Sequence, residues 1–201
     1  MEKKATNIHP VFDQLLQRPE RENLLQQRSC VLWMTGLSGS GKSTIAKGLE
    51  KKLFESGYLS YVLDGDNIRS GINSNLGFSD EDRTENIRRV SEISKLLVDA
   101  GIITINSFVS PTKDITQAAK DIIGEKDFLE VYINAPFEVC AQRDVKGLYK
   151  KALAGEIKNF TGLDAPFEAP ENPDIEIKTP EMRVEQSVDL IFEQLIKRIK
   201  K

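Results

Sequence analysis

The sequence predicts an α/β fold, a three-layer sandwich in which helices cover both faces of a parallel sheet. Short apolar runs alternate with segments of helical periodicity, as in proteins built from strand–helix–strand units. The first run, Cys-Val-Leu-Trp-Met at residues 30–34, is continuously apolar, which is typical of a strand buried on both faces. A length of 201 residues, with 39% hydrophobic and 29% charged residues, fits an ordinary globular domain.

Strands are expected where an apolar run ends at glycine, proline or polar residues. In chain order the expected strands are residues 30–34, 58–63, 102–109, 128–133 and 175–178. Helices are expected where apolar residues recur every three or four positions. These segments are residues 43–56, 85–100, 114–123, 137–143 and a last helix opening at 179–181. Parallel strands need right-handed crossovers, which the helices supply.

The chain is expected to divide into an N-terminal arm, residues 1–28, and a domain, residues 29–201. The arm is polar apart from four apolar residues at helical spacing, Val11, Phe12, Leu15 and Leu16. We expect them to dock the arm on the domain, and the alternative is a segment that binds a partner. Residues 145–174 have no clear period and are too long for a passive connection, so we predict a lid there.

Composition and charge argue against several classes of function. A net charge of −3 disfavours a nucleic-acid binder. No apolar run approaches the ~20 residues that cross a membrane, and the first ten residues lack the apolar stretch of a secretory signal. Cys30 and Cys140 cannot form a disulfide framework and are interpreted as small buried hydrophobes. Together these features favour a cytoplasmic location.

Residues 36–43, GLSGSGKS, fit the pattern G-x-x-x-x-G-K-[ST] between an apolar strand and an amphipathic helix. Glycines let successive N–H groups turn toward an anion, and the helix N-terminus adds partial positive charge. We expect Lys42 to contact the β- and γ-phosphates of a nucleoside triphosphate, Ser43 to bind Mg²⁺ and Thr44 to contact the α-phosphate. The expected nucleotide-binding residues of this loop are Gly36, Leu37, Ser38, Gly39, Ser40, Gly41, Lys42, Ser43 and Thr44. The alternative, a chance glycine turn, would not require the flanking strand and helix.

A pair of aspartates follows the second expected strand, at the sheet edge where ligands bind in open α/β folds. A hydroxyl that accepts a phosphoryl group needs a group to take its proton, and a carboxylate suffices. We assign Asp64 as this base and Asp66 as the residue that orients metal or substrate, although the sequence does not separate the two roles. The alternative is a solvated Asp-Gly turn.

These and further segments resemble the adenylylsulfate kinase family over roughly residues 30–178. The matching segments are GLSGSGKST (36–44), LDGDNIR (63–69), LGFSDEDRTENIRRV (76–90), KGLYKKA (146–152), GEIKNFTG (155–162) and APFEAPENP (165–173). The resemblance implies a P-loop fold like that of nucleotide kinases, and a homodimer. It implies Mg²⁺-dependent transfer of the ATP γ-phosphoryl to the 3′-hydroxyl of adenosine 5′-phosphosulfate (APS), in sulfate assimilation. The products are 3′-phosphoadenosine 5′-phosphosulfate and ADP.

Two aromatic residues match those that hold the purine ring of APS in the family. Phe78 and Phe160 are expected to sandwich the base, and such stacking is worth about 1–3 kcal/mol per base. The alternative for both rings is ordinary burial in the core.

The family resemblance also implies polar residues for the phosphosulfate, namely Arg69, Arg83 and Asn86. Arg83 and Asn86 are three positions apart and therefore share a helix face, and arginine offers a planar fork to oxyanions. The alternative is a solvated surface whose charges pair with one another, which we expect for Arg88 and Arg89.

The remaining candidate residues follow the third strand and open the lid. The resemblance implies that Ser110 is catalytic as a transient phosphoserine; a hydrogen bond to the acceptor is the alternative, because direct transfer needs no covalent intermediate. Arg143 is expected to pack on the ATP adenine. Lys146 and Lys150 are expected to approach phosphates as the lid closes, and the alternative is a solvated charged surface.

The chain departs from the family pattern in the loop after the third strand. Lys113 and Thr116 stand where arginines are common, and lysine lacks the planar fork, so a weaker anion contact is expected there. Other departures are Ser70 for histidine and Val145 for proline. The rival functions are a P-loop kinase for another small nucleotide or a sugar acid, and a nucleotide-gated switch. The sequence lacks the N-K-x-D motif of a GTPase switch.

Overall fold

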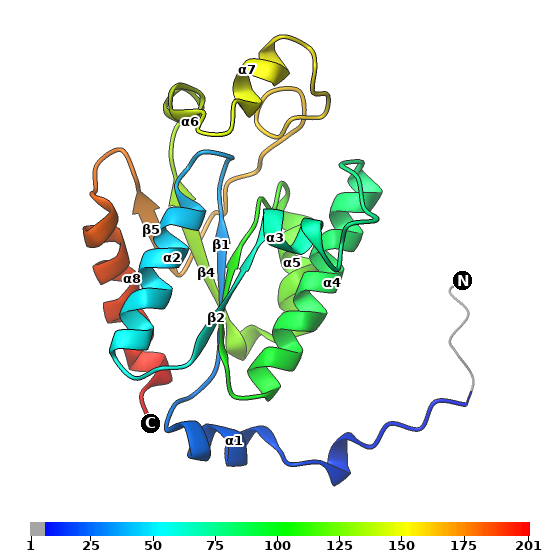
Figure 1. Ribbon diagram of the computed structural model, residues 1–201, viewed down its shortest axis with the longest axis vertical. Coiled ribbons are helices and arrows are strands. Elements are labelled where there is room, and N and C mark those ends of the chain that lie inside the picture. The colour runs from blue at the N-terminus through cyan, green and yellow to red at the C-terminus, as the bar shows by residue number, and fades with distance from the viewer. Residues whose placement is uncertain (1–6) are drawn as a thin grey trace.

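The computed structural model describes residues 7–201 and contains one five-stranded sheet with all strand pairs parallel (Figure 1). The sheet order is β2-β3-β1-β4-β5. The strands are β1 Val31–Thr35, β2 Ser60–Asp64, β3 Ile103–Ser107, β4 Phe128–Asn134 and β5 Ile175–Lys178. The predicted α/β class with a parallel sheet is confirmed.

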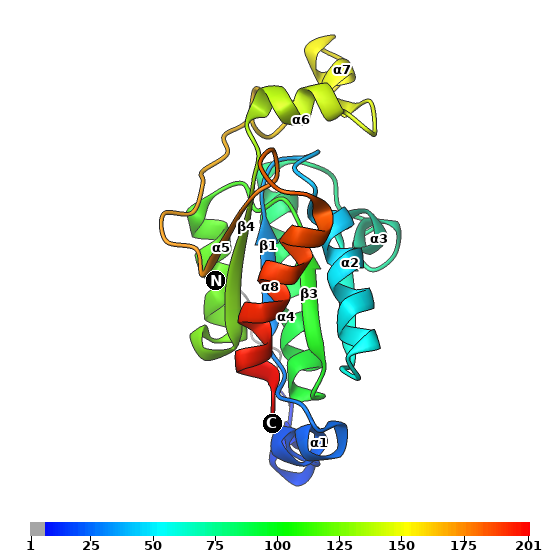
Figure 2. The ribbon, with the colours of Figure 1, turned by 90° about the vertical axis from the view of Figure 1, so that its left-hand side faces the viewer.

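Helices cover both faces of the sheet, as the alternating pattern predicted (Figures 1 and 2). The α-helices are α1 Arg18–Leu25, α2 Lys42–Glu55, α3 Gly65–Ser70, α4 Asp80–Asp99, α5 Lys113–Ile123, α6 Phe137–Arg143, α7 Leu148–Leu153 and α8 Val184–Ile199. Two short 3₁₀ helices are η1 Phe12–Gln14 and η2 Glu125–Asp127. Among residues 7–201, no helix combines the length and the apolar character that a membrane span requires.

The central strand β1 explains why both faces must be covered. Its residues are all buried, and successive side chains point to opposite faces. Leu32 and Met34 belong to the core layer of α2 and α8, whereas Val31 and Trp33 belong to the layer of α4 and α5. Each such side chain contributes about 1.5–3 kcal/mol when it leaves water. The position of the loop that follows β1 is therefore fixed from both sides.

Several element boundaries differ from the expected ones. Helix α4 begins at Asp80 rather than at residue 85, because the Ser79 hydroxyl caps the backbone N–H of Asp82. Helix α3 occupies residues expected to form only a turn, and Asp64 caps it by accepting from the Asp66 N–H. Strand β3 ends at Ser107, and α8 begins at Val184.

The described part of the arm attaches through polar contacts rather than through its apolar residues. Arg18 bonds Glu22 and Asp127, and Gln27 donates to the carbonyls of Leu59 and Gly101. The four apolar residues expected to dock the arm are at least half exposed: Val11, Phe12, Leu15 and Leu16. That expectation is wrong for the conformation seen here, because the residues that hold the arm lie in and after α1.

The segment predicted to be a lid, residues 145–174, lies at one end of the molecule and α1 at the other (Figures 1 and 2). Helices α6 and α7 stand beyond the carboxyl ends of the strands, and a long irregular segment returns from them to β5. A small apolar cluster joins this segment to the loop after β1 and includes Leu37, Tyr149 and Phe160.

Candidate active site

The candidate residues gather because all five strands run in the same direction. The glycine-rich loop follows β1, the two aspartates lie at the end of β2 and the start of α3, Ser110 follows β3 and the lid follows β4. In open α/β sheets the loops at this edge form the ligand site.

The loop after β1 adopts a backbone shape that requires glycine. Gly36, Gly39 and Gly41 have φ values of +147°, +75° and +111°. A Cβ on Gly36 would lie 2.4 Å from the carbonyl oxygen of Ile133, so an alanine would clash with backbone. Loops of this kind direct N–H groups at an anion beside a helix N-terminus, here that of α2. The loop fits a phosphate group.

Lys42 lies buried at the start of α2. Its Nζ donates to the carbonyl oxygens of Gly36 and Leu37, both at 2.8 Å. Burial lowers the pKa of Lys42 to about 8. A cation held only by neutral carbonyls in a dry site would gain more from an anionic partner.

Ser43 and Asp64 meet at the mouth of the same loop. The Ser43 hydroxyl donates to Asp64 Oδ2 at 2.6 Å, and Ser107 Oγ lies 3.4 Å from Ser43 Oγ. Hydroxyl and carboxylate oxygens suit a hard divalent cation. Within residues 7–201 no cluster of three or more His, Cys, Asp or Glu could hold a metal. A cation at Ser43 would therefore depend on oxygens of a bound phosphate.

Asp66 has a different partner from Asp64. Its exposed carboxylate pairs with Lys146 Nζ from the segment between α6 and α7. This contact joins the lid to the end of β2. The two aspartates are thus distinct in this conformation: Asp64 faces the loop after β1, and Asp66 faces the lid.

Phe78 forms an exposed aromatic platform beside two arginines. The ring is 61% exposed, and the guanidinium carbons of Arg69 and Arg83 lie 4.5 and 5.8 Å from its centroid. Burial lowers the pKa of Arg69, and repulsion from Arg83 lowers it further. Two cations held close together beside a flat ring fit an aromatic ligand that carries anionic groups.

Arg83 also connects this platform to the lid. It donates to the Thr161 hydroxyl at 3.0 Å and to the Asn159 carbonyl at 2.6 Å. Phe160 lies between these partners in the chain but is only 9% exposed, with its ring edge-on to Tyr149. Phe78 and Phe160 thus belong to neighbouring segments, but Phe160 is packed inward.

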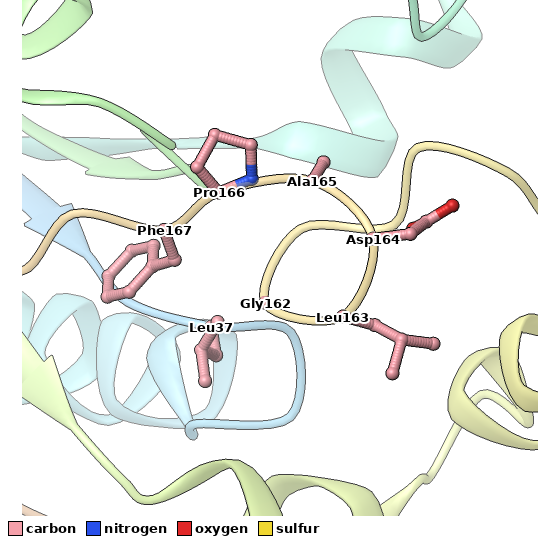
Figure 3. A pocket seen from close by; sticks show the side chains of 7 residues that line it. All are labelled: Leu37, Gly162, Leu163, Asp164, Ala165, Pro166 and Phe167. Carbon is pink, nitrogen blue, oxygen red and sulfur yellow. The ribbon is translucent and has the colours of Figure 1, made fainter.

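Beside these residues lies a cavity of about 460 Å³ between Leu37 and residues 162–167 (Figure 3). Of the candidate site residues, Leu37 of the phosphate loop lines this cavity. The loop that carries Asp164 and Pro166 arches over Leu37, and Phe167 closes one side.

Two expected substrate or catalytic residues are buried. Asn86 is buried and accepts from Asn73 Nδ2 at 3.0 Å. Ser110 is 1% exposed, and its Oγ accepts from the indole N–H of Trp33 at 2.9 Å. Both side chains already have protein partners.

Arg143 contacts the outside of the glycine-rich loop. It donates to the carbonyls of Gly39 and Ser40 and to the hydroxyl of Thr179, which itself donates to the Ser40 carbonyl. Thr44 is exposed on the first turn of α2. The support from Thr179 was not expected, because nothing in its local sequence indicates contact with a loop 139 residues away.

The remaining charged candidates pair with their neighbours. Arg88 and Arg89 both bind Glu85, as the charge-pairing alternative predicted. Lys113 pairs with Glu171 in the returning segment, and Thr116 donates to the carbonyl of Thr112. At the two positions where family arginines are missing, the side chains therefore bond to the protein itself. Lys150 is exposed.

The loop after β1 is lined by glycines, holds a buried lysine and lies at the edge of a parallel sheet. These features define a P-loop protein of the small-molecule kinase type. The comparisons with known proteins narrow this class. The family model described as adenylylsulphate kinase matches residues 28–178, more than half of the chain, and the chain belongs to this family.

Relatives over the full length agree with this family. The chain is 55% identical over 201 residues to an adenylyl-sulfate kinase of Bacteroides thetaiotaomicron, covering 100% of both chains. It is 58% identical over 194 residues to one of Clostridium acetobutylicum, covering 96% of both. The solved APS kinase of Mycobacterium tuberculosis, in complex with AMPPNP and APS, is 44% identical with a TM-score of 0.81. That match covers 84% of this chain and 98% of the other.

Proposed function

We propose that this protein transfers the γ-phosphoryl group of ATP to the 3′-hydroxyl of APS, giving ADP and 3′-phosphoadenosine 5′-phosphosulfate. The observation that carries the proposal is the placement of two sites side by side. The phosphate loop with Lys42 and Ser43 faces Asp64, and the Phe78 platform with its two arginines connects to the lid over that loop. The relatives named as adenylyl-sulfate kinases support this acceptor.

In this proposal ATP lies along the loop of residues 36–44. The loop amides and Lys42 bind the β- and γ-phosphates, and Arg143 packs against the adenine. The Ser43 hydroxyl, beside the Asp64 carboxylate, would hold Mg²⁺. A Mg²⁺ ion held there would neutralise negative charge on the bound phosphates.

Asp64 serves as the base. The 3′-oxygen of APS forms a bond to the γ-phosphorus, and the bond from that phosphorus to the β,γ-bridging oxygen breaks, so that ADP leaves. The proton of the 3′-hydroxyl moves to an Asp64 oxygen. Asp66 orients the acceptor, and its contact with Lys146 lets the lid close over the site.

The acceptor nucleotide is held by its ring and by its anionic groups. Phe78 stacks on the purine, and Arg69 and Arg83 bind the phosphosulfate oxygens. Phe160 would complete the sandwich only after its ring leaves Tyr149. Asn86 would have to release Asn73 in the same way.

For Ser110, a phosphoprotein intermediate fits less well than hydrogen bonding. A phosphoserine would need room for a phosphoryl group on an oxygen that is buried at a 1% exposed residue and already accepts from the indole N–H of Trp33. We propose that Ser110 donates its hydroxyl proton to the acceptor or to a bound phosphate while Trp33 holds its oxygen. Intact-protein mass spectrometry after turnover with ATP alone should show no added phosphate.

The decisive test of the function is a direct assay. Purified protein is mixed with Mg-ATP and APS, and chromatography follows ADP and the doubly phosphorylated nucleotide. AMP and gluconate replace APS in parallel reactions, and EDTA removes Mg²⁺. Product formation only with APS and only with Mg²⁺ supports the proposal. Faster turnover with AMP or gluconate would support the rival P-loop kinase instead.

Phe78→Ala should raise the KM for APS far more than the KM for ATP. Removing one stacking partner costs about 1–3 kcal/mol, or roughly 5- to 150-fold in acceptor affinity. The matched control is Phe54→Ala, which removes another exposed ring, on α2. Equal increases in both KM values would contradict the stacking role.

The affinity for ATP should fall as the pH rises above about 8, the pKa of the buried Lys42 in the unliganded protein. Bound phosphates favour the ammonium form and raise its pKa, so binding at about pH 9 must take up a proton. Calorimetry of AMPPNP binding in two buffers of different ionisation enthalpy measures this uptake. If the wild-type protein and Lys42→Ala take up the same number of protons on binding AMPPNP, the proton belongs to a group other than Lys42.

We propose a homodimer in the cytoplasm, built from an arm of residues 1–28 and a kinase domain of residues 29–201 whose lid spans about residues 145–174. The exposed apolar side chains of the arm support an interface there. A solved APS kinase of Thiobacillus denitrificans is hexameric; it is 26% identical with a TM-score of 0.65, and the match covers 86% of this chain and 29% of that one. Light scattering of the full chain distinguishes these states.

A further inference from the structure

The lid residue Tyr149 has a contact with the phosphate loop that the proposed mechanism does not use. It lies on α7, is 1% exposed, and its hydroxyl donates to the Ser38 carbonyl at 2.8 Å. Burial raises the pKa of this phenol, so the hydroxyl stays a donor at all pH values at which the enzyme would work. The lid thus supplies a buried hydrogen-bond donor to one peptide group of the phosphate loop.

The orientation of that peptide group matters for phosphate binding. The described chain has no cis peptide bond, and in a planar trans peptide the carbonyl and the following N–H point in opposite directions. Holding the Ser38 carbonyl toward the lid therefore turns the Gly39 N–H away from the lid. Gly39 has a φ of +75°, and glycine also populates negative φ, so this peptide can flip unless it is held.

The position of the Tyr149 hydroxyl is itself fixed by the lid. Its ring packs edge-on against Phe160 at 4.9 Å and Phe137 at 5.3 Å between centroids. Its backbone N–H donates to the carboxylate of Asp144, which also accepts from the Lys150 N–H. The phenol can hold the loop only when α7 and the segment carrying Phe160 are in place.

We propose that Tyr149 is a positioning residue that holds the Ser38–Gly39 peptide with its N–H toward the bound phosphates and thereby couples lid position to ATP binding. The identity of the ligand rests on the proposed function. Phe160, a candidate for the acceptor base, packs on the same ring. Tyr149 therefore connects the ATP side of the site to the acceptor side.

The test compares Tyr149→Phe with wild type by calorimetry, titrating Mg-AMPPNP and APS separately. The variant keeps the ring and loses only the hydroxyl, which also contacts the Cys140 thiol. The Kd for AMPPNP should rise about 3- to 10-fold, the effect of losing the hydrogen bond to the Ser38 carbonyl. The Kd for APS should stay unchanged. Tyr58→Phe, a partly buried tyrosine on the core layer of α2 and α8, is the matched control.

A second variant separates positioning from a general structural role. Tyr149→Leu also removes the ring against which Phe137 and Phe160 pack, so it should weaken AMPPNP binding more than Tyr149→Phe does and should also change the Kd for APS. If Tyr149→Phe binds AMPPNP as tightly as wild type, or loses both ligands equally, the proposal is overturned. A different result would contradict the proposed function: the wild-type protein would bind AMPPNP but make no 3′-phosphorylated product.

Discussion

Asp64→Asn should abolish phosphoryl transfer while the protein still binds ATP. The asparagine Oδ1 can still accept a hydrogen bond from the Asp66 N–H and so cap α3. The fold at the end of β2 is therefore kept. What is lost is the carboxylate that faces Ser43, which we propose takes the proton of the acceptor hydroxyl. The loss of a general base lowers kcat by about 100- to 10,000-fold. Initial rates of ADP formation and calorimetry of AMPPNP binding measure the two effects.

The comparison variants make this result specific. Asp121→Asn removes an exposed carboxylate on α5 and should leave turnover unchanged. Asp66→Asn removes the partner of Lys146 and should raise the KM for APS more than it lowers kcat. Turnover near the wild-type rate in Asp64→Asn would refute the base assignment. Loss of AMPPNP binding as severe as the loss of turnover would instead make Asp64 a residue that holds the metal.

The sequence was most informative where function depends on local chain geometry. The phosphate loop could be predicted because its glycines, Lys42 and Ser43 lie within eight residues and between two recognisable elements. The burial of β1 on both faces followed from its continuously apolar run, which is typical of a strand covered by helices on each side. In both cases the determining residues are close together in the chain.

The sequence was least informative where a side chain has a distant partner. Phe160 packs on Tyr149, and Asn86 bonds Asn73, so neither presents its side chain to the cavity. The exposed apolar residues of the arm are a further example, since helical spacing indicates an apolar face but not what it contacts. Such contacts depend on tertiary structure, which periodicity does not encode.

One missed boundary did have a local signal. The first turn of α4 has no apolar period, since Asp80, Glu81 and Asp82 precede the apolar stripe. Ser79 followed three residues later by Asp82 nevertheless marks a helix N-terminus, and three acids suit the positive end of a helix dipole. This start places Arg83 in the first turn, within reach of both Phe78 and the lid. With the correct boundary, the sequence would have predicted that Arg83, at the N-terminus of α4, lies beside Phe78.

Lys42→Ala should weaken ATP binding and slow the chemical step together. Hydrogen bonds to charged groups contribute about 1.5–3 kcal/mol, so the Kd for AMPPNP should rise about 10- to 150-fold. Negative charge grows on the β,γ-bridging oxygen as ADP leaves, and removing one preorganised donor costs about 100- to 1,000-fold in kcat. Lys47→Ala, an exposed lysine on the same helix α2, is the matched control.

The unliganded contacts of Lys42 explain why both parameters should change. Its ammonium already bonds two carbonyls in a buried site, so its charge is incompletely balanced until phosphate arrives. Alanine removes that charge from the free enzyme, the ATP complex and the transition state alike. Binding of APS alone should stay unchanged, because Phe78, Arg69 and Arg83 lie on other elements. A variant that loses APS affinity as strongly as AMPPNP affinity would show that Lys42 supports the fold of the whole site rather than the phosphates.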